Sequence, residues 1–302
     1  MIQTCHTPDC EGNETDRFRV TDLNRRIDTR EFYYLHCEKC GLFRLKNVPD
    51  NLGDYYPDDY YALPTAEQLA VIASSNSFKI DTIKRFKTEG KLLEIGPAYG
   101  VFAFQAKQAG FQVDVIEMDA LCCEHLNHVV GVNAICSASP HEVISTLESH
   151  DIIALWHVIE HVPNPWTLIS AAAENLAPNG ILVMAAPNPD AWQFRIMGRV
   201  WPHLDAPRHL YLLPAQALTE YAKSLGLERV HYSTTDSDAK SWNRFGWQRL
   251  LMNRVRGKWL KGIAFVIGGV LSMFMMPFEI SGSKGSAYTL IFRKINSAME
   301  CK

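Results

Sequence analysis

The sequence predicts an α/β fold in which a doubly wound, mostly parallel seven-stranded sheet follows a small cysteine-bearing module. Two observations support this prediction. From Lys91 onward, short apolar runs alternate with segments of helical length, which is typical of a parallel sheet covered by helices. Four of the eight cysteines lie within the first 40 residues of the 302-residue chain, a length that allows a main domain and a smaller module.

Residues 1–48 are expected to form a zinc-ribbon-like module. Cys37-x2-Cys40 is followed by glycine, and Cys5-x4-Cys10 holds a proline that helps the chain to turn. Four thiolates in two such pairs suit a tetrahedral, structural Zn²⁺ ion. Disulfides or a redox pair are the alternatives, but the N-terminus lacks the pattern of a secretory signal, so we expect a cytoplasmic, reduced chain. The remaining cysteines are expected to be buried or incidental: Cys122, Cys123, Cys136 and Cys301.

Residues 49–90 are expected to be a linker with a helix. A loop rich in tyrosine, proline and aspartate comes first, and a helix is predicted from about Ala66 to Lys87. The main domain then covers residues 91–302. Its strands are predicted at 91–95, 112–117, 132–136, 151–155, 180–186, 228–234 and 287–293, and its helices at 101–109, 120–129, 140–148, 165–176 and 214–225. The net charge is -3, so nothing in the composition indicates a nucleic-acid partner.

The first strand of the main domain leads into a glycine-bearing loop, Glu94 to Gly100, with the pattern E-x-G-x-x-x-G. Glycine permits close approach of the backbone, and a turn between a strand and a helix brings main-chain N–H groups against a ligand. A dinucleotide-binding loop would carry G-x-G-x-x-G, but Ala98 stands two residues after Gly96, so the pyrophosphate spacing is absent. Glu94 would repel a diphosphate and suits a ligand that carries an ammonium group.

A second acid, Glu117, ends the next predicted strand, 17 residues beyond Gly100. A carboxylate at this point can accept hydrogen bonds from both hydroxyl groups of a ribose. Taken singly, Glu94 and Glu117 could be surface acids at strand ends, and the glycines could be plain turn residues. Their occurrence together at βαβ spacing favours a site for an adenosine-containing cofactor.

Five segments together resemble the class I S-adenosylmethionine-dependent methyltransferases, specifically the branch similar to ubiquinone-biosynthesis O-methyltransferases. They are LLEIGPAYG, VDVIEMD, DIIALWHVIEHVPNP, LAPNGILVMAAPNP and DAPRHLYLLP. The resemblance covers residues from about 90 to 235 and the last strand. It implies a Rossmann-like sheet and methyl transfer from S-adenosylmethionine. The family usually has glycine where this chain has Ala98, and similar methyltransferases often begin with a zinc ribbon.

The resemblance also implies roles for single residues. Those after the first strand would line the methionine portion and the sugar of the cofactor: Glu94, Gly96, Ala98 and Gly100. Those after the second and third strands would bind the ribose and the adenine: Glu117 at the ribose hydroxyls, Met118 on the adenine, and Ser137 and Ala138 beside it. Trp156 and His157, after the fourth strand, would border the sulfonium end.

The turn W-H-V-I-E-H, residues 156–161, offers two candidates for catalysis. An oxygen nucleophile gains from a general base, and histidine suits neutral pH. His157 and His161 are four residues apart, so a helical turn would place both imidazoles on one face at the carboxyl edge of the sheet. A zinc site of the H-E-x-x-H kind would need glutamate where Val158 stands. The alternative for His161 is a helix-capping or core-facing side chain.

The segment W-P-H-L-D-A-P-R-H-L-Y, residues 201–211, is predicted to be a loop that can cover the site after the fifth strand. Arg208 is a candidate to pair with a phosphate or carboxylate of the acceptor, and His203 or His209 is an alternative base. Asn188, at the end of that strand, is another candidate acceptor contact. The alternative is an ion pair between Asp205 and Arg208 that only braces the loop.

Residues 236–286 are predicted to be a structured, helical insertion before the last strand, because they are too many for an ordinary loop. The uncharged stretch 263–278 follows four basic residues: Arg254, Arg256, Lys258 and Lys261. Sixteen residues are few for a membrane span. The stretch is expected either to pack over the sheet or in a dimer contact, or to dock peripherally, through 254–278, on the inner face of a membrane.

The combined expectation is an S-adenosylmethionine-dependent methyltransferase that acts on an oxygen of a small molecule, a saccharide or a lipid-linked acceptor. Two rival functions remain open. An NAD(P)-dependent oxidoreductase is disfavoured by Ala98 and Glu94. A non-catalytic, zinc-bearing adaptor that binds S-adenosylmethionine is disfavoured by the pair Glu94 and Glu117. The sequence does not indicate an oligomeric state.

Overall fold

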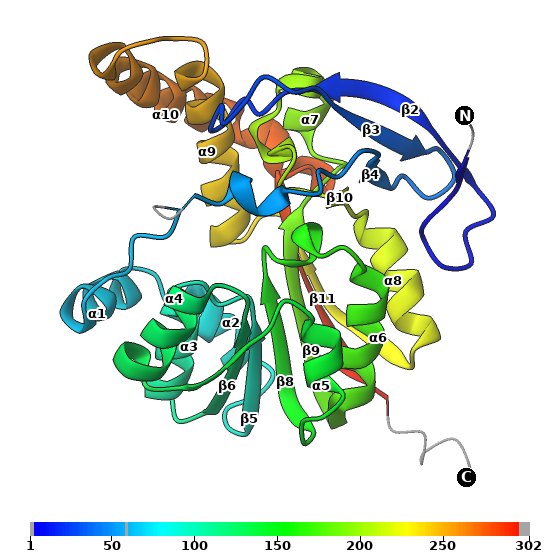
Figure 1. Ribbon diagram of the computed structural model, residues 1–302, viewed down its shortest axis with the longest axis vertical. Coiled ribbons are helices and arrows are strands. Elements are labelled where there is room, and N and C mark those ends of the chain that lie inside the picture. Colours follow the sequence, from blue (N-terminus) through cyan, green and yellow to red (C-terminus); the bar gives the residue numbers. More distant parts are fainter. Residues whose placement is uncertain (1–2, 58–59, 296–302) are drawn as a thin grey trace.

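The computed structural model describes residues 3–57 and 60–295 and contains a seven-stranded sheet in the order β11-β12-β9-β8-β5-β6-β7 (Figure 1). Five strands run parallel to one another: β5 (Lys91–Ile95), β6 (Gln112–Glu117), β7 (Asn133–Cys136), β8 (His150–Trp156) and β9 (Leu176–Pro187). The last two are antiparallel to the strands beside them: β11 (Leu227–Ser233) and β12 (Ala287–Lys294). The predicted fold class is therefore confirmed.

Helices cover both faces of this sheet (Figure 1). One face packs on α2 (Phe78–Lys84) and α3 (Val101–Gln108), and the other packs on α6 (Pro165–Asn175) and α8 (Ala215–Ser224). The remaining helices of this part are α1 (Ala66–Ser75), α4 (Ala120–His125) with a π-helical turn at Leu126–Val130, and α5 (Pro140–Ile144). The central strands are buried on both sides, which is why most of β8 and the second half of β9 are apolar runs.

Several predicted elements differ from the structure in their bounds; the helix predicted at 140–148, for example, ends at Ile144. The helix expected from 66 to 87 is two helices, because the polar run 74–77 breaks it: the side-chain oxygen of Asn76 accepts a hydrogen bond from the N–H group of Phe78, at 3.1 Å. The strand expected from 180 begins at Leu176. Its first residues bulge out of register beside His150, and Asn179 adopts a left-handed φ of 59° there.

A second, antiparallel sheet forms the N-terminal module. Its strands are β1 (Gln3–Thr4), β2 (Asn13–Val20), β3 (Phe32–Cys37), β4 (Phe43–Leu45) and β10 (Tyr211–Leu212). The last of these comes from the loop predicted at 201–211, so this sheet is completed by a segment far away in the sequence. Short helices lead into and surround that loop: η1 (Leu52–Tyr55), η3 (Ile159–His161), α7 (Trp192–Met197), η4 (Gly198–Val200) and η5 (Pro202–Leu204).

The insertion between β11 and β12 is a helical hairpin. It consists of α9 (Ser237–Met252), α10 (Lys258–Ile280) and the short helix η6 (Ser281–Ser283). In Figure 1 the hairpin projects from the body of the molecule, above α1 and away from the sheet. By length and composition alone, the helical segment Lys258–Ser283 could cross a membrane.

Candidate cofactor and active site

The loop after β5 requires residues that tolerate a left-handed backbone. Gly96, Ala98 and Gly100 have φ angles of 66°, 52° and 81°. A Cβ atom at Gly96 would lie 2.7 Å from Cγ2 of Val158, and one at Gly100 would lie 2.6 Å from Cδ2 of Leu126. Gly100 is also the N-cap of α3. The loop therefore brings its own N–H groups and the start of a helix to the carboxyl edge of the sheet.

Glu117 connects this loop to the turn after β6. Its carboxylate accepts hydrogen bonds from the N–H groups of Ala98, Met118 and Asp119, at 2.9, 2.7 and 3.0 Å. The residue is only 4% exposed. A buried carboxylate with these three donors is fixed in orientation, and the bond to Ala98 is the one that joins two separate βα turns.

Glu94 is the second buried acid of the site and is 3% exposed. Within the described part of the chain, its Oε2 atom has no hydrogen-bond partner. Burial raises the pKa of the Glu94 carboxyl to about 7, although Lys79 acts in the opposite direction and favours the charged form. An unpaired, buried carboxylate oxygen beside a glycine loop fits the ammonium group of an amino-acid portion, such as that of S-adenosylmethionine.

The residues expected around the adenine lie on the edge formed by β6 and β7. Met118 is 68% exposed and Ala138 is exposed, while the N–H group of Ser137 donates to the carbonyl oxygen of Glu117 at 2.8 Å. Met118 and Ala138 thus present open apolar surface at this edge.

Trp156, at the end of β8, is buried and forms a wall of the site. Its ring packs edge-on against Phe78 and Phe102, with centroid distances of 6.3 and 5.6 Å. Lys79 Nζ lies 5.1 Å from the centre of the indole ring. Lys79 also faces Glu94, so α2 adds a cation to the site that no pattern in the sequence indicated.

His157 is held between two acids. Its Nε2 atom lies 2.6 Å from Oδ2 of Asp238, and its Nδ1 atom lies 3.7 Å from Oε1 of Glu160. Burial alone would disfavour the imidazolium, but Asp238 and Glu160 outweigh it and raise the pKa of His157 to about 9. The indole of Trp242 lies against the imidazole at a centroid distance of 4.2 Å. His157 is therefore protonated at neutral pH, which does not fit the expected role of a free base.

His161 lies in a different environment. Residues Ile159–His161 form a 3-10 turn and His157 has a φ of 57°, so the two histidines do not share one helical face as the spacing suggested. The Nδ1 atom of His161 lies 3.0 Å from the carbonyl oxygen of Arg208 and 3.1 Å from the hydroxyl of Tyr56. Burial and the neighbouring His209 lower the pKa of His161 to about 4, so its imidazole is neutral at pH 7.

Glu160 connects the two histidines. It is fully buried, and within the described residues neither of its carboxylate oxygens has a hydrogen-bond partner. Possible ligand atoms of Glu160, His161 and His209 lie within 4.8 Å of one another. Burial favours the neutral acid, but His157, His161 and His209 outweigh it and lower the pKa of Glu160. The turn thus carries one buried negative charge among three imidazoles.

Two of the residues expected to contact the acceptor have structural contacts instead. Asn188 is fully buried, and its amide group donates to the carbonyl oxygens of Ser283 and Gly285, at 3.3 and 2.8 Å. His203 is 1% exposed, and its Nε2 atom lies 3.0 Å from the carbonyl oxygen of Trp242. Both side chains are buried and held by backbone carbonyl oxygens, so the acceptor-binding role does not fit Asn188. Nδ1 of His203 has no hydrogen-bond partner within the described residues, but the burial of the ring does not favour an acceptor contact there either.

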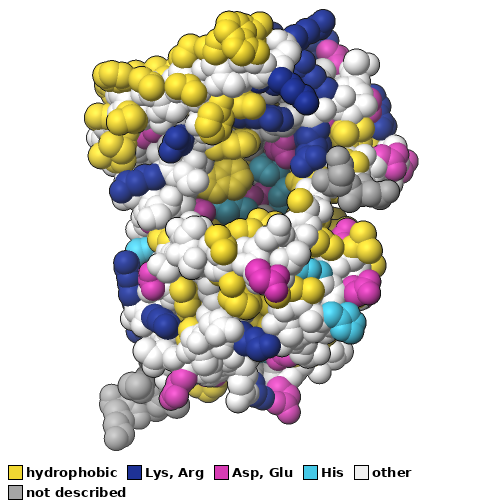
Figure 2. All heavy atoms as spheres, turned by 90° about the vertical axis from the view of Figure 1, so that its left-hand side faces the viewer, with side chains coloured by type: hydrophobic (Ala, Val, Ile, Leu, Met, Phe, Trp, Pro, Cys, Tyr) yellow, Lys and Arg dark blue, Asp and Glu magenta, His cyan; other side chains and the backbone are white. Residues whose placement is uncertain are grey.

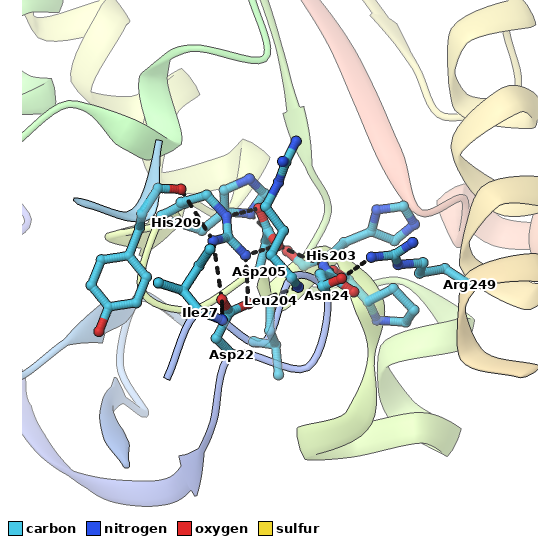
Figure 3. A network of polar contacts seen from close by, with 12 residues as sticks. Asp22, Asn24, Ile27, His203, Leu204, Asp205, His209 and Arg249 are labelled. Atoms are coloured by element: carbon cyan, nitrogen blue, oxygen red, sulfur yellow. Dashed lines mark hydrogen bonds and ion pairs between the residues drawn. The ribbon is translucent and has the colours of Figure 1, made fainter. Parts of the chain in front are cut away.

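Arg208 is the third such correction. Its guanidinium is fully buried and lies 2.7 Å from Oδ1 of Asp22 and 2.8 Å from Oδ1 of Asp205. The ion pair between Asp205 and Arg208, which was the alternative to acceptor binding, is therefore present. Asp22 extends this ion pair to the N-terminal module. Figure 3 shows Asp22 and Asp205 converging with Asn24 and His209 in this network. His209 Nδ1 lies 2.8 Å from the carbonyl oxygen of His203. The side chain of His209 also belongs to the cluster around Glu160, which Arg208 contacts through its carbonyl oxygen.

The four N-terminal cysteines come together as the sequence predicted. Sγ of Cys5 lies 3.5 Å from that of Cys40, and Sγ of Cys10 lies 3.8 Å from that of Cys37. All four are free thiols, so the disulfide alternative is not supported. The sulfur atoms lie within 4.8 Å of one another, and zinc bound at about 2.3 Å by four sulfurs would space them about 3.8 Å apart. A Cβ atom at Gly12 would lie 2.6 Å from Cys37 Sγ, so the chain leaves space around the sulfurs.

The three other cysteines in the described part of the chain do not take part in this cluster. Cys122 and Cys123 are buried, and Cys136 is exposed. Cys301 lies outside the described residues.

A hollow separates the two halves of the molecule. Figure 2 shows it between the part that carries the apolar top surface and the part below, with histidine and acidic side chains on its floor. His157 and Asp238 retain 12% and 16% side-chain exposure, so this pair is partly open to solvent. Asp238 and Trp242 both come from the insertion, and sequence patterns gave no signal that these residues would meet the turn after β8.

Comparison with known proteins agrees with the geometry. A family model described as a methyltransferase domain matches residues 72–232, which is more than half of the chain. The ubiquinone biosynthesis O-methyltransferase of Saccharophagus degradans is 26% identical over 152 residues, which cover 46% of this chain and 64% of that protein. The protein of the same name from Hydrogenovibrio crunogenus is 30% identical over 112 residues, which cover 35% and 46%. The chain thus spans less than two thirds of the length of either relative.

A solved structure shows the same fold at low identity. The phosphoethanolamine N-methyltransferase 2 of Haemonchus contortus, in complex with S-adenosyl-L-methionine, is 16% identical with a TM-score of 0.52. The similarity covers 95% of this chain and 70% of that one. The family match leaves out the cysteine module and the helical hairpin.

Proposed function

The chain belongs to the methyltransferase-domain family, and from this membership we propose that it transfers a methyl group from S-adenosylmethionine to an oxygen atom of a small-molecule acceptor. The observation that carries the proposal is the buried carboxylate of Glu94, two residues before Gly96, whose Oε2 atom has no hydrogen-bond partner within the described residues. When bound, S-adenosylmethionine supplies an electrophilic methyl group on a sulfonium.

The cofactor role of each acid follows from its contacts. Glu94 would accept hydrogen bonds from the ammonium group, which would satisfy its free oxygen and favour its charged form. Glu117 would accept the ribose hydroxyls in place of the N–H group of Ala98. Met118, Ser137 and Ala138 would border the adenine, and Trp156 would border the sulfonium.

The two histidines have different roles in this proposal. His161 is neutral at pH 7, and its Nδ1 atom is already engaged by the carbonyl oxygen of Arg208, so Nε2 is the atom that can take a proton from an acceptor hydroxyl. His157 is an imidazolium that would orient an acceptor with negative charge and stabilise the oxyanion. Burial keeps the pKa of His161 low, and the neighbouring imidazole of His209 acts in the same direction.

The acceptor is defined by its chemistry, as a molecule that offers a hydroxyl group. Both curated relatives are named as O-methyltransferases of ubiquinone biosynthesis, which supports a hydroxyl acceptor for this chain. A saccharide or a lipid-linked molecule with such a hydroxyl meets the same requirement. A nicotinamide dinucleotide fits this loop poorly, because Ala98 interrupts the G-x-G-x-x-G spacing and a charged Glu94 would repel a diphosphate.

We also propose that Cys5, Cys10, Cys37 and Cys40 hold a structural Zn²⁺ ion. The sulfur spacing supports this assignment, and the ion would join the start of β2 to the hairpin of β3 and β4. It lies in a different sheet from the cofactor loop, so its role is to hold the fold of the module.

Glu117→Gln is expected to weaken the binding of S-adenosylhomocysteine by about 10- to 100-fold, because the amide cannot accept two charge-assisted hydrogen bonds from the ribose. Isothermal titration calorimetry measures the effect. Glu124→Gln, an exposed acid on α4, serves as the matched control and should bind like the unchanged protein. Binding of NADH but not of S-adenosylhomocysteine by the unchanged protein would overturn the cofactor assignment in favour of an oxidoreductase.

Asp238→Asn is expected to change how stability depends on pH. The folded pKa of His157, about 9, lies above its ordinary value of 6.5. The stabilisation from its pairing is therefore complete below pH 6.5 and is lost as the pH rises through 9, with an upper value of roughly 3 kcal/mol. Asp238→Asn should thus be destabilised most at pH 6 and progressively less toward pH 9.5.

Urea unfolding at several pH values tests this expectation, with Asp190→Asn, an exposed acid, as the control. A difference between the Asp238 variant and the unchanged protein that stays constant from pH 6 to pH 9.5 would show that His157 is not held charged by this pair.

A further inference from the structure

Helix α10 exposes an unusually apolar face. Six of its large apolar side chains are each more than half exposed: Trp259, Val266, Ile267, Met273, Phe274 and Phe278. Only 22% of the most apolar window of the segment Lys258–Ser283 is buried. In Figure 2 apolar side chains form a continuous band along the top of the molecule. A contiguous apolar surface of this extent marks a site of contact with a partner or a membrane.

The opposite face of α10 is firmly packed, so this orientation is fixed by the fold. Ala264, Gly268 and Ser272 recur every four residues and are buried against α9. A Cβ atom at Gly268 would lie 2.5 Å from the Cα atom of Gln248, which means that the two helices touch at their backbones. At the C-terminal end, Glu279 accepts hydrogen bonds from Gln193 and from the indole N–H group of Trp247, both at 2.7 Å.

The charged residues around the apolar face of α10 are basic. Between Asp238 and Glu279 the sequence has no acidic residue but seven basic ones: Lys240, Arg244, Arg249, Arg254, Arg256, Lys258 and Lys261. The last four lie in the turn between the helices and in the first turn of α10, and all four are exposed. A second copy of the chain would bring the same basic residues against one another, whereas anionic lipid headgroups are complementary to them.

The topology favours a helix that lies along a membrane surface. Both ends of the hairpin return to the central sheet, since α9 follows β11 and α10 leads into β12. If α10 crossed a bilayer, the chain would have to return through α9, which carries charged side chains at Asp238, Lys240, Arg244 and Arg249. Charges within the hydrocarbon region are costly, so the hairpin does not suit a pair of spans.

We propose that the outward face of α10 docks on the surface of an anionic membrane, with the apolar side chains in the interface and the basic residues at 254–261 on the headgroups. The proposal concerns a surface outside the cofactor site. It holds or fails independently of the methyl transfer.

Docking of α10 would also place the hollow that contains His157 and Asp238 close to the membrane. Asp238 and Trp242, which contact His157, belong to α9, so the helix that supports α10 also forms a wall of the candidate active site. In Figure 2 the apolar surface and the hollow open on the same side of the molecule. An acceptor with a lipid tail would be presented to the site from the membrane; this last step rests on the proposed function.

Vesicle flotation with the full chain tests the docking, without cofactor or acceptor. We expect binding to phosphatidylcholine vesicles that contain phosphatidylglycerol, weaker binding at high salt, and at least about tenfold weaker binding to pure phosphatidylcholine. Arg254→Gln, Arg256→Gln and Lys258→Gln together should weaken binding on the order of 100-fold. The matched control, Lys84→Gln, Arg85→Gln and Lys87→Gln together, removes the same charge from the end of α2 and should bind like the unchanged protein.

A second pair of variants tests the apolar part of the contact. Val266→Ser with Phe274→Ser should weaken binding at least about tenfold, whereas Val48→Ser with Val129→Ser, two exposed positions elsewhere, should not change it. Trp259 should be quenched by lipids with brominated acyl chains, and Trp259→Phe should remove that part of the quenching. Circular dichroism and thermal melting check that each variant is folded.

Failure of the folded, unchanged protein to bind anionic vesicles would overturn the proposal. A second result would also overturn it: the unchanged protein does not bind vesicles but forms a dimer in solution, and Val266→Ser with Phe274→Ser abolishes that dimer. The apolar face of α10 would then be covered by a second copy of the chain. If the variant with Arg254, Arg256 and Lys258 replaced binds anionic vesicles as well as the unchanged protein does, these basic residues do not contact the headgroups. The assignment to an anionic surface would then be overturned.

Discussion

Cys37→Ser is expected to abolish zinc binding and to destabilise the N-terminal module by several kcal/mol, which is the largest single effect that we foresee. Structural zinc contributes on the order of 10 kcal/mol to the folding of small zinc-binding peptides, so losing one of four thiolates removes more free energy than a module of this size can spare. Metal analysis of the purified protein should find one zinc per chain, and none in the variant.

Loss of zinc should also affect the main domain, because the N-terminal module contacts it. Tyr34, in β3, is buried, and its hydroxyl donates to the carbonyl oxygens of Leu204 and His209, at 3.0 and 2.6 Å. β4 pairs with β10, which belongs to the loop that adjoins the candidate active site. Thermal melting of the Cys37 variant should therefore show an early transition, and addition of a strong chelator to the unchanged protein should reproduce it.

Cys136→Ser provides the control, because Cys136 is exposed and lies outside the cluster. This variant should keep its zinc and melt within about 2 °C of the unchanged protein, as surface substitutions usually do. Freshly purified, folded protein that contains no zinc and resists chelators would contradict the assignment of the four cysteines.

The sequence predicts those features that are set by short-range patterns. Apolar runs identify β8 and the second half of β9, since a strand buried on both faces has no polar side. The Cys37-x2-Cys40 spacing fixes a turn that presents two sulfurs, and the second pair must then lie opposite. Glu94 and Glu117 are found for the same reason, because each ends a parallel strand and such ends meet at one edge of a sheet.

The features that were missed depend on segments that are distant in the sequence. His157 meets Asp238, 81 residues later, and this contact reverses its expected protonation state. No local pattern identifies a partner across that separation. The same is true of Lys79, which reaches the site from α2 in the segment expected to be a linker.

The spacing of residues in the sequence also does not predict whether a polar side chain near the site is buried. Asn188 and His203 were placed correctly near the end of β9 and in the following loop, yet both are buried, and backbone carbonyl oxygens engage the amide of Asn188 and Nε2 of His203. A polar residue beside a site has the same appearance in the sequence whether its side chain faces the ligand or the protein interior.

Arg208→Met is expected to destabilise the protein by about 3–5 kcal/mol, because it leaves the carboxylates of Asp22 and Asp205 without their partner in a buried place. Both oxygens of Asp22 lie near the guanidinium, and Asp22 also accepts from the N–H groups of Arg25 and Ile27, at 3.1 Å each. Loss of the cation thus affects the turn after β2 as well as the loop that carries Arg208 (Figure 3). Urea unfolding followed by circular dichroism measures the change.

A matched set of variants separates the charge of Arg208 from its shape. Arg195→Met, an exposed arginine on α7, should be close to neutral, and Arg208→Lys should fall between, since lysine keeps the charge but not the two-pronged geometry. In a background of Asp22→Asn and Asp205→Asn, Arg208→Met should cost much less than alone, because no buried carboxylate is left unpaired. An equal cost in both backgrounds would mean that Arg208 acts through packing alone. A reduced cost would establish that a buried ion network attaches the cysteine module to the loop beside the active site.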